Sequence, residues 1–442
     1  MITDVGKGAS SEMTPPLRKW FILLTAMVLT LLLIGYVTKL HHLVKVVPSF
    51  EPRSCFQKGK VAKGIITKLN GIRTFITAAY YDNRHANLIR AIGIIPHEEQ
   101  KDLYCWFHCR SDDGRLETSK ALVDIHSDWF GFPYGTADLI CHEPEDCDPK
   151  YVSFHWSEDG DCTQISMFEI RNRHPEALSA EFTVCLSTMF GQYNNVLLFI
   201  QSVEMYKLLG VKRVMIYKSD VSQYMERVLQ HYISEGTIEI IPWKITSFLK
   251  VSKRWHYNMS HADIGYYGQL TALNDCIYRN MYRTKYLMLH DIDEIVLPIR
   301  HPNWSTMMAD LSKQRPDIGV FMFENYVFRF DVFDTTFNMS IWKTIPGTNI
   351  LQHIHREPHI GEMKYKGRKM VINPRKAIQT SVHKVLKTSG PTFSVPPHIG
   401  ILYHCRKQYQ ANLSIQSLIR DTTIWKYSAP LIQRVNTVLK EL

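Results

Sequence analysis

Residues 182–298 alternate between short apolar runs and segments with helical spacing, and this alternation limits the folds open to the chain more than any other feature. Gly210 directly follows the first helical segment and Gly236 comes shortly after the second, and a left-handed glycine commonly ends a helix. Alternating strands and helices predict a parallel sheet with right-handed crossovers, a Rossmann-like half of an α/β fold. The expected strands are 182–189, 211–217, 237–242 and 286–289, and the expected helices are 196–209, 223–234 and 267–281.

Two common functions of such a sheet are disfavoured because their motifs are missing. No Gly-x-Gly-x-x-Gly follows the first expected strand, and the sequence contains no Walker phosphate-binding loop. The sequence therefore argues against a dinucleotide-dependent oxidoreductase and against a P-loop nucleotidase.

The last expected strand ends in a group of acids, within Tyr286-Leu-Met-Leu-His-Asp-Ile-Asp-Glu-Ile-Val-Leu-Pro298. Side chains alternate along an extended chain, so Asp291 and Asp293 point the same way. Two adjacent carboxylates repel unless one is protonated or a cation lies between them, and oxygen ligands suit Mg²⁺ or Mn²⁺. Ligands of open α/β sheets bind beyond the carboxyl ends of strands, so this position favours a divalent metal site over a solvated surface turn.

The charge of the chain restricts its partners. The 442 residues carry a net charge of +10, with 45% hydrophobic and 12% aromatic residues. This composition is typical of a packed globular protein, and the charge favours phosphate-bearing small molecules, an anionic membrane or nucleic acid. No Lys/Arg-rich block and no nucleic-acid-binding motif is present, so we do not expect nucleic acid as a partner.

The N-terminal region predicts a membrane anchor. Residues 1–19 form a polar tail, expected in the cytoplasm, and residues 20–37 contain no charged side chain. About 20 apolar residues span a bilayer, and cleaved signal peptides end in small residues, so we expect one uncleaved signal-anchor helix at 20–37. Lys and Arg are balanced on its two sides and do not decide its orientation.

Features downstream of the anchor favour a luminal C-terminal region and a single-pass type II topology. All nine cysteines lie there, which is typical of disulfide-bonded luminal domains, and the odd number leaves at least one thiol free or paired with another chain. The spacings Cys105–Cys109 and Cys141–Cys147 match no common zinc finger, so we expect disulfides. Sequons for N-glycosylation occur at Asn258, Asn303, Asn338 and Asn412.

Several motifs occur in a familiar order, namely Leu208-Leu-Gly-Val-Lys-Arg-Val-Met-Ile-Tyr217, Ile241-Pro-Trp243, Tyr267-Gly-Gln-Leu-Thr-Ala-Leu-Asn-Asp-Cys276 and Asp291-Ile-Asp-Glu294 with Pro298. Together they resemble glycosyltransferase family 92, a family of animal β1,4-galactosyltransferases, over residues 70–430. The resemblance implies a GT-A fold, UDP-galactose as the sugar donor, Mn²⁺ dependence and inversion at the anomeric carbon. It also implies a glycan acceptor on a glycoprotein or glycolipid, and a place in the Golgi membrane. The expected organisation is a stem at 38–64, an accessory β-rich region at 65–180 and a catalytic domain at 181–430.

The resemblance assigns metal and donor contacts. In GT-A enzymes the last Asp of the triplet binds the metal, which assigns Asp293, and the first lies near both donor and metal, which assigns Asp291. His404, in Leu402-Tyr-His-Cys-Arg406, resembles the late His-Tyr-Arg element of the family and is expected as the third ligand, although Cys405 replaces the usual Tyr. The alternatives are a packed core histidine at His404 and a ligand role for His383.

The remaining assignments are a base and further donor contacts. Inversion needs a general base, and Glu324, or else Asp331, follows the next apolar strand where inverting GT-A enzymes place it. Lys369 and Arg375 flank Met-Val-Ile-Asn-Pro and are expected to contact the diphosphate, the alternative being surface cations. Gln269 is expected near the donor. On the same helix Asp275 is expected to pair structurally, and Cys276 could bridge to Cys185.

Two rival functions stay open at this point. The first is a non-catalytic relative of the family that binds a glycan or a nucleotide sugar, although the intact pair Asp291 and Asp293 argues against decay of the site. The second is another metal-dependent phosphate enzyme, such as a nuclease. A two-metal nuclease needs more acidic ligands, and no second acidic cluster is present in the sequence.

Overall fold

The computed structural model describes residues 15–44, 60–98, 101–109, 116–160, 165–174, 177–359 and 367–442. The chain divides into two compact units, Met1–Pro52 and Arg53–Leu442. Much of the expected tail and stem, residues 1–14 and 45–59, lies outside the described residues.

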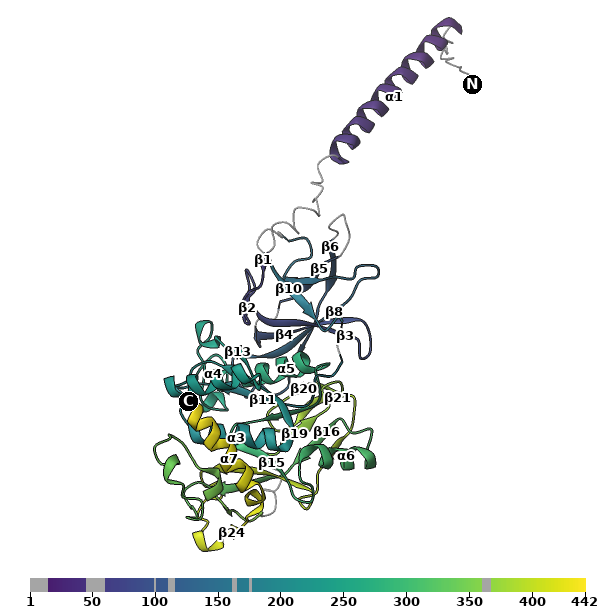
Figure 1. Cartoon of the computed structure of the whole chain (residues 1–442). Coiled ribbons are helices and arrows are strands. Elements are labelled where there is room, and N and C mark those ends of the chain that lie inside the picture. The colour runs from purple at the N-terminus through teal and green to yellow at the C-terminus, as the bar shows by residue number, and fades with distance from the viewer. Residues whose placement is uncertain are drawn as a thin grey trace, which may run out of the picture. The chain divides into compact units, whose positions relative to one another are not determined.

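The first unit contains one helix, α1 (Pro15–Val44), over the segment expected as an anchor (Figure 1). Its described apolar side chains are exposed, among them Leu23 and Leu32. Within the described residues, no helix combines enough length with enough apolar character to cross a membrane. The anchor at 20–37 stays a prediction from the sequence.

The second unit is built around a seven-stranded sheet in the order β13-β12-β11-β14-β19-β16-β22. Its first four strands are parallel, as the sequence predicts, and β19 is antiparallel to both of its neighbours. From β11 the chain adds β12 and β13 on one side and then β14 on the other side, so the strand order reverses between β11 and β14. Nucleotides bind at such a switch point in open α/β sheets. The strands are β11 (Ala180–Met189), β12 (Val211–Lys218), β13 (Ile238–Pro242), β14 (Thr284–His290), β16 (Val320–Phe323), β19 (Lys369–Ile372) and β22 (Thr392–Ser394).

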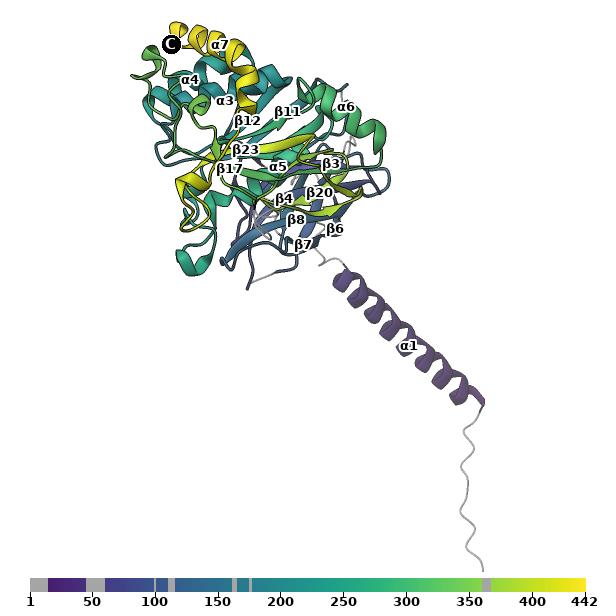
Figure 2. The ribbon, with the colours of Figure 1, turned by 90° about the horizontal axis from the view of Figure 1, so that it is seen from below.

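Both faces of this sheet are covered, and the strands alternate between two cores. On β14, Met288 points into one core and Leu289 into the other. The first core contains helices α3 (Val196–Leu209), α4 (Gln223–Glu235), α6 (Trp304–Gln314) and α7 (Ser428–Glu441), and α7 lies against α3 (Figure 2). The second core contains α5 (Gln269–Asn280) and strands of the N-terminal region.

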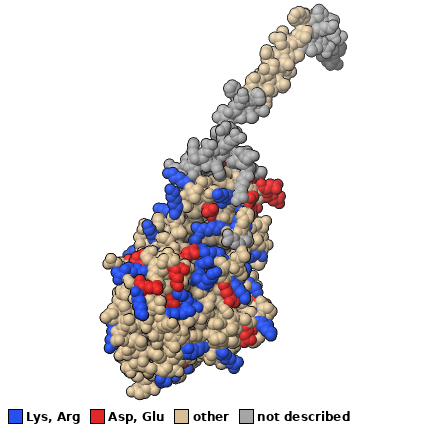
Figure 3. Space-filling model, viewed as in Figure 1, with Lys and Arg blue, Asp and Glu red and all other residues tan. Residues whose placement is uncertain are grey.

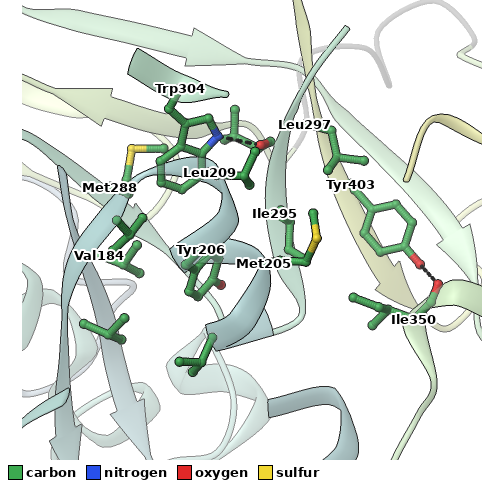
Figure 4. Packing of buried hydrophobic residues seen from close by; sticks show 14 of the residues in the cluster. Val184, Met205, Tyr206, Leu209, Met288, Ile295, Leu297, Trp304, Ile350 and Tyr403 are labelled. Atoms are coloured by element: carbon green, nitrogen blue, oxygen red, sulfur yellow. Dashed lines mark hydrogen bonds between the residues drawn. The ribbon is translucent and has the colours of Figure 1, made fainter. Parts of the chain in front are cut away.

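Figure 4 shows part of the first core, where buried polar groups find partners among apolar neighbours. The indole of Trp304 donates to the carbonyl of Val296 over 2.7 Å, and the hydroxyl of Tyr403 donates to the carbonyl of Ile350 over 2.9 Å. A buried polar group without a partner would cost stability, so these bonds let large aromatic side chains fill the core.

The region expected as an accessory β-rich part is a ten-stranded sheet that encloses its own apolar core. It comprises β1 (Lys60–Val61), β2 (Thr67–Lys68), β3 (Phe75–Asp82), β4 (Leu88–Pro96), β5 (Tyr104–His108), β6 (Leu116–Lys120), β7 (Leu122–Ile125), β8 (Tyr134–His142), β9 (Tyr151–His155) and β10 (Ser166–Arg171). We call these strands and their loops the β-rich region. Inner faces of β3 and β4 also enter the core beneath α5, which joins the region to the central sheet.

The cysteines form disulfides, as predicted. Cys105 bonds to Cys141 and Cys109 to Cys147 inside the β-rich region, which confirms that these spacings belong to no zinc site. The disulfide Cys185–Cys276 joins β11 to α5. Among the described cysteines Cys405 is a buried free thiol, while Cys55 and Cys162 lie outside the described residues.

A five-stranded sheet completes the unit, in the order β15-β23-β17-β18-β24. Strand β23 is antiparallel to β15 and parallel to β17, and its register places His404 opposite Glu294. The strands are β15 (Glu294–Pro298), β17 (Asn325–Arg329), β18 (His355–Arg356), β23 (Gly400–Arg406) and β24 (Ile419–Arg420), and a separate hairpin pairs β20 (Ala377–Thr380) with β21 (Val385–Thr388).

The surface carries mixed charge rather than one basic block. On the face shown in Figure 3, Lys and Arg side chains lie in several groups with Asp and Glu between them. The sequon residues Asn258, Asn338 and Asn412 are exposed, whereas the side chain of Asn303 caps α6 by accepting a hydrogen bond from the Thr306 amide over 3.0 Å.

A buried ionic network anchors the β-rich region to the rest of the unit. Asp82 on β3 pairs with Arg84 over 2.7 Å and with Arg90 over 3.0 Å, and Arg90 also reaches Asp138 over 2.7 Å. Arg84 donates onward to the hydroxyl of Tyr278 on α5 over 2.9 Å. Burial alone would raise the pKa of the Asp82 carboxyl, but the two guanidinium groups outweigh burial and lower it from 3.8 to about 2.

This pKa predicts an acid-sensitive contribution to stability. The unfolded chain binds the Asp82 proton more readily than the folded chain, so the contribution present above pH 3.8 is lost as the pH falls towards 2. A shift of this size corresponds to about 2–3 kcal/mol. We expect the free energy of unfolding, measured in denaturant from pH 5 to pH 2, to fall by about that much more in the wild type than in Asp82→Asn. Asp102→Asn, which alters an exposed pair with Lys120, is the control, and equal slopes for wild type and Asp82→Asn would contradict the prediction.

Candidate active site

The acidic loop Asp291–Glu294 connects β14 to β15 at the carboxyl end of the parallel strands. The backbone carbonyl groups of residues 292, 293 and 294 each accept a hydrogen bond from a neighbouring element. The carbonyl of Ile292 accepts from the Ser202 hydroxyl over 2.9 Å, and that of Glu294 accepts from the Tyr206 hydroxyl over 3.0 Å, both from α3. The carbonyl of Asp293 accepts from the amide of Cys405 on β23 over 3.1 Å. The loop is therefore fixed by protein contacts alone.

Asp291 is held by two neighbours. Its Oδ2 lies 2.9 Å from Nζ of Lys369, and its Oδ1 accepts from the Gln269 side chain over 3.1 Å. The side chain keeps 35% of its surface exposed. Burial of the carboxylate would raise its pKa, but Lys369 outweighs burial and lowers the pKa to about 2, so Asp291 is ionised at neutral pH.

Glu294 is the buried centre of the site, with 1% of its side chain exposed. Its Oε2 accepts from the Asp291 amide over 2.9 Å and lies 3.3 Å from Nζ of Lys369, while its Oε1 lies 3.3 Å from Nδ1 of His404. Burial raises the pKa of Glu294 to about 7 although Lys369 opposes the shift. Glu294 thus connects the lysine to the histidine. The sequence analysis gave it no role, although its position directly after the aspartate pair was the available signal.

His404 lies between two carboxylates. Its Nδ1 faces Glu294 and its Nε2 lies 3.4 Å from Oδ2 of Asp293. Burial would lower the pKa of His404, but Asp293 and Glu294 raise it above its ordinary value. In metal-binding histidines one ring nitrogen usually contacts a carboxylate, which orients the ring so that the other nitrogen can bind the metal.

The arrangement fits a divalent ion held by two protein ligands. Asp293 offers an oxygen and His404 a nitrogen on a shared side, and Mg²⁺ or Mn²⁺ commonly completes such a set with water and phosphate oxygens. Within the described residues, no three His, Cys, Asp or Glu side chains are grouped so as to hold a metal ion. The expected triad of Asp291, Asp293 and His404 is therefore not formed, because Asp291 is bound to Lys369 and Gln269 instead.

Two expected diphosphate contacts are corrected by the structure. Lys369 is 1% exposed and its ammonium lies between Asp291 and Glu294, whose charges raise its pKa against the effect of burial. The guanidinium of Arg375 donates to the backbone carbonyls of Met281, Thr284 and Lys285, at the opposite end of β14 from the acids. Neither cation reaches the cleft, because each is fully engaged inside the protein.

The two base candidates also lie outside the wall of the cleft. Glu324 is buried at the junction of β16 and β17, with Oε2 3.9 Å from Nδ1 of His359. Asp331 is half-exposed and forms a paired salt bridge with Arg329. Asp275 pairs structurally, as predicted, because its buried carboxylate accepts from the hydroxyls of Tyr80 and Tyr217, each over 2.6 Å.

The acids open into a cleft of about 1070 Å³ with two walls. We call one the sheet wall, formed by residues 186–190 at the end of β11 with Trp255 and Tyr266. We call the other the outer wall, formed by Asn325, Phe330, Arg406, Lys407 and Tyr409.

His383 also lines the cleft. Its Nδ1 lies 3.1 Å from the carbonyl of Arg368, which fixes Nδ1 as the donor and leaves Nε2 able to accept a proton. The side chain is exposed to the cleft, yet the surrounding walls desolvate it and lower its pKa to about 4, so it is neutral at pH 7.

Aromatic residues on the sheet wall were missed by the sequence analysis. The rings of Trp255 and Tyr266 stack with centroids 4.2 Å apart and planes at 12°. Tyr266 and Tyr267 have positive φ angles of 41° and 55°, which bulky residues rarely adopt and which cluster at functional sites. The sequence Tyr-Tyr-Gly before α5 was the signal, but a left-handed tyrosine pair cannot be read from residue types.

The family comparison decides the class of protein. Residues 180–435, more than half of the chain, match the model of glycosyltransferase family 92. The chain belongs to glycosyltransferase family 92.

Two curated relatives of this family 92 chain come from Caenorhabditis elegans. The chain is 23% identical over 238 residues to beta-1,4-galactosyltransferase galt-1, a match that covers 51% of each chain. It is 22% identical over 216 residues to glycosyltransferase family 92 protein F13G3.3, covering 49% of this chain and 39% of that protein. The matched part thus spans about half the length of these relatives, or less.

The solved structures that match the chain include that of UDP-glucose pyrophosphorylase complexed with UDP-glucose. The match has 11% identity and a TM-score of 0.24, and it covers 60% of the family 92 chain and all of the other chain.

The burial of Lys369 beside two acids leads to a prediction about the free energy of unfolding. Lys369→Met would leave the buried Glu294 and the partly exposed Asp291 beside each other without their cation. We expect the free energy of unfolding at pH 7 to fall by roughly 3–5 kcal/mol, as measured by denaturant unfolding. Lys384→Met, which removes an exposed lysine paired with Asp128, should cost less than about 1 kcal/mol. Equal losses for the two variants would contradict the prediction.

Proposed function

We propose that this family 92 glycosyltransferase inverts the anomeric carbon of a hexose as it transfers the sugar from a UDP-sugar donor to a hydroxyl of a glycan. The carrying observation is the buried unit Glu294–His404–Asp293, which faces a cleft at the switch point of a parallel sheet. Galactose as the hexose, and a β1,4 linkage, are supported by the name of the first relative. The strand order of the central sheet supports a GT-A fold.

The donor is proposed to lie along the sheet wall. Nucleotides in open α/β sheets bind beyond the carboxyl ends of the strands, here the ends of β11 and β14. Trp255 and Tyr266 lie there and give the uracil ring an aromatic surface. The ionised carboxylate of Asp291, held in place by Lys369 and Gln269, is available to a donor hydroxyl.

Asp293 and His404 would hold Mn²⁺. A bound ion would neutralise the charge that develops on the departing diphosphate. Glu294 would fix the ring of His404 through Nδ1, and the carbonyl contacts behind the loop would keep Asp293 in place without rearrangement. Lys369 and Arg375 do not line the cleft, so the bound ion itself would be the cation that meets the phosphate oxygens.

The acceptor hydroxyl must lose a proton as it attacks the sugar. Glu324 and Asp331 do not line the cleft, so we assign this role to His383, which lines it and whose Nδ1 contact with the Arg368 carbonyl leaves Nε2 as the acceptor nitrogen. The proton would move from the acceptor oxygen to Nε2 as the bond from that oxygen to the anomeric carbon forms. The bond from the anomeric carbon to the UDP oxygen breaks in the same step.

The proposal extends to location. A single-pass type II protein of the Golgi membrane is supported by three disulfides and three exposed sequon residues in the described part of the chain. The second candidate, a non-catalytic relative, would bind UDP or glycan without turnover. The variants below separate the two.

The first test removes the metal-facing carboxylate. With UDP-galactose, Mn²⁺ and a glycan array as acceptors, we expect Asp293→Asn to lower the transfer rate at least 100-fold, because the ion loses its oxygen ligand. Calorimetry should show that Mn²⁺ no longer tightens UDP binding to this variant. Asp310→Asn, which changes a half-exposed acid on α6, is the matched control and should retain activity. Metal-dependent UDP binding without any turnover in the wild type would favour the non-catalytic relative.

The second test removes the proposed base. His383→Gln keeps a polar side chain but has no lone pair of suitable basicity, so we expect kcat for transfer to fall by about 10²–10⁴-fold. His398→Gln, an exposed histidine that does not line the cleft, is the control. A rate within about threefold of wild type in His383→Gln would remove His383 from this role, while unchanged Mn²⁺-dependent UDP affinity would show that the variant is folded.

A further inference from the structure

The outer wall carries a surface that the donor does not explain. Phe330 is 37% exposed and Tyr409 is 42% exposed, and both line the cleft. Large aromatic side chains are usually buried, and contiguous exposure of such groups marks binding surfaces. Around them stand hydrogen-bond donors, the side chains of Asn325, Arg406 and Lys407.

Both aromatic residues are held by an ordered backbone. The amide of Phe330 donates to the carbonyl of Arg406 over 3.2 Å, which extends the pairing of β17 and β23 by one residue. The carboxylate of Glu357, itself 3% exposed, accepts from the amides of Tyr409 and Gln410 over 2.7 and 3.0 Å. The guanidinium of Arg406 lies 5.5 Å from the centre of the Tyr409 ring. A binding surface presented this rigidly loses little entropy when a ligand binds.

The surface continues beyond the cleft. A second, smaller cavity is lined by Asn325 and Tyr409, which also line the cleft, and by Pro358 and His359. Tyr409 therefore stands where the two cavities adjoin. The second cavity is small, about 20 Å³, but the cleft of about 1070 Å³ that it adjoins has room for more than one sugar ring beside Phe330 and Tyr409.

We propose that the outer wall binds the acceptor glycan through at least two sugar rings, the reacting terminal sugar at Phe330 and the next sugar at Tyr409. The proposal rests on the proposed function. A pyranose ring has an apolar face of C–H groups and an edge of hydroxyl groups, so aromatic rings contact the face while Asn325, Arg406 and Lys407 bind the hydroxyls.

The alternative occupant of this wall is the nucleobase of the donor. The position of the wall argues against it, since the carboxyl ends of β11 and β14 belong to the sheet wall and the outer wall comes from β17, β23 and the segments that follow them. The acidic loop and both walls line one cleft, so an acceptor on the outer wall and a donor on the sheet wall would share it, as direct transfer requires.

The test separates the two substrates kinetically. With Mn²⁺, UDP-galactose and an oligosaccharide identified on a glycan array, we expect Phe330→Ala to raise the acceptor KM at least fivefold and the donor KM less than threefold. Phe333→Ala is the matched control, because Phe333 is 63% exposed, lies three residues further along and does not line the cleft. It should leave both constants unchanged.

The length of the acceptor tests the second sugar position. Tyr409→Ala should raise the KM of the oligosaccharide at least fivefold but change that of the methyl glycoside of its terminal sugar less than twofold. Phe330→Ala should raise both, and Tyr409→Phe, which keeps the ring, should restore the oligosaccharide KM. Mn²⁺-dependent UDP binding and the unfolding midpoint verify that each variant is folded.

Two outcomes would overturn the proposal while leaving the proposed function intact. Wild-type transfer with an unchanged acceptor KM in both Phe330→Ala and Tyr409→Ala would show that the outer wall does not bind the acceptor. A donor KM that rises more than the acceptor KM would place the nucleotide there instead. A wild-type protein that transfers no sugar to any acceptor would count against the proposed function itself.

Discussion

One buried ammonium group makes the rest of the site possible. Lys369 lies between Asp291 and Glu294, and without it two acids would have to share a region from which water is largely excluded. Removing water from a carboxylate is costly unless a partner replaces it. Because Lys369 supplies that partner, Asp291 stays ionised and Glu294 can remain buried beside His404. The chemistry proposed for Asp293 therefore depends on a residue that does not reach the cleft.

The central parallel strands and their helices could be predicted from sequence because their signals are local. Each signal predicts the structure of the residues that carry it. Examples are the apolar run before Asp291, the helical spacing of 196–209 and the glycines that end α3 and α4. Strand β19 could not be predicted in the same way. Its place between β14 and β16 depends on pairing with residues far away in the chain, and nothing in Lys369–Ile372 specifies those partners.

The same distinction explains the success and failure of the site predictions. Asp293 and His404 lie together as expected, since the first follows a strand and the second lies in a recognisable motif, whereas Asp291 is bound to Lys369 and Gln269. The roles of Lys369 and Arg375 were not foreseen, because a cation that contacts phosphate and one that is buried beside acids or carbonyls look alike in sequence. Burial decides between these roles, and burial depends on the tertiary fold.

The position of β19 also affects the order in which the protein can mature during synthesis. Asp291 and Lys369 are separated by 78 positions in the chain, so the acids leave the ribosome several seconds before their cation at about 5–20 residues per second. During that interval the aspartates and Glu294 must stay hydrated, and the surrounding segments cannot close over them. A nascent chain stalled before residue 369 would therefore present these acids without the cation that neutralises them in the finished protein.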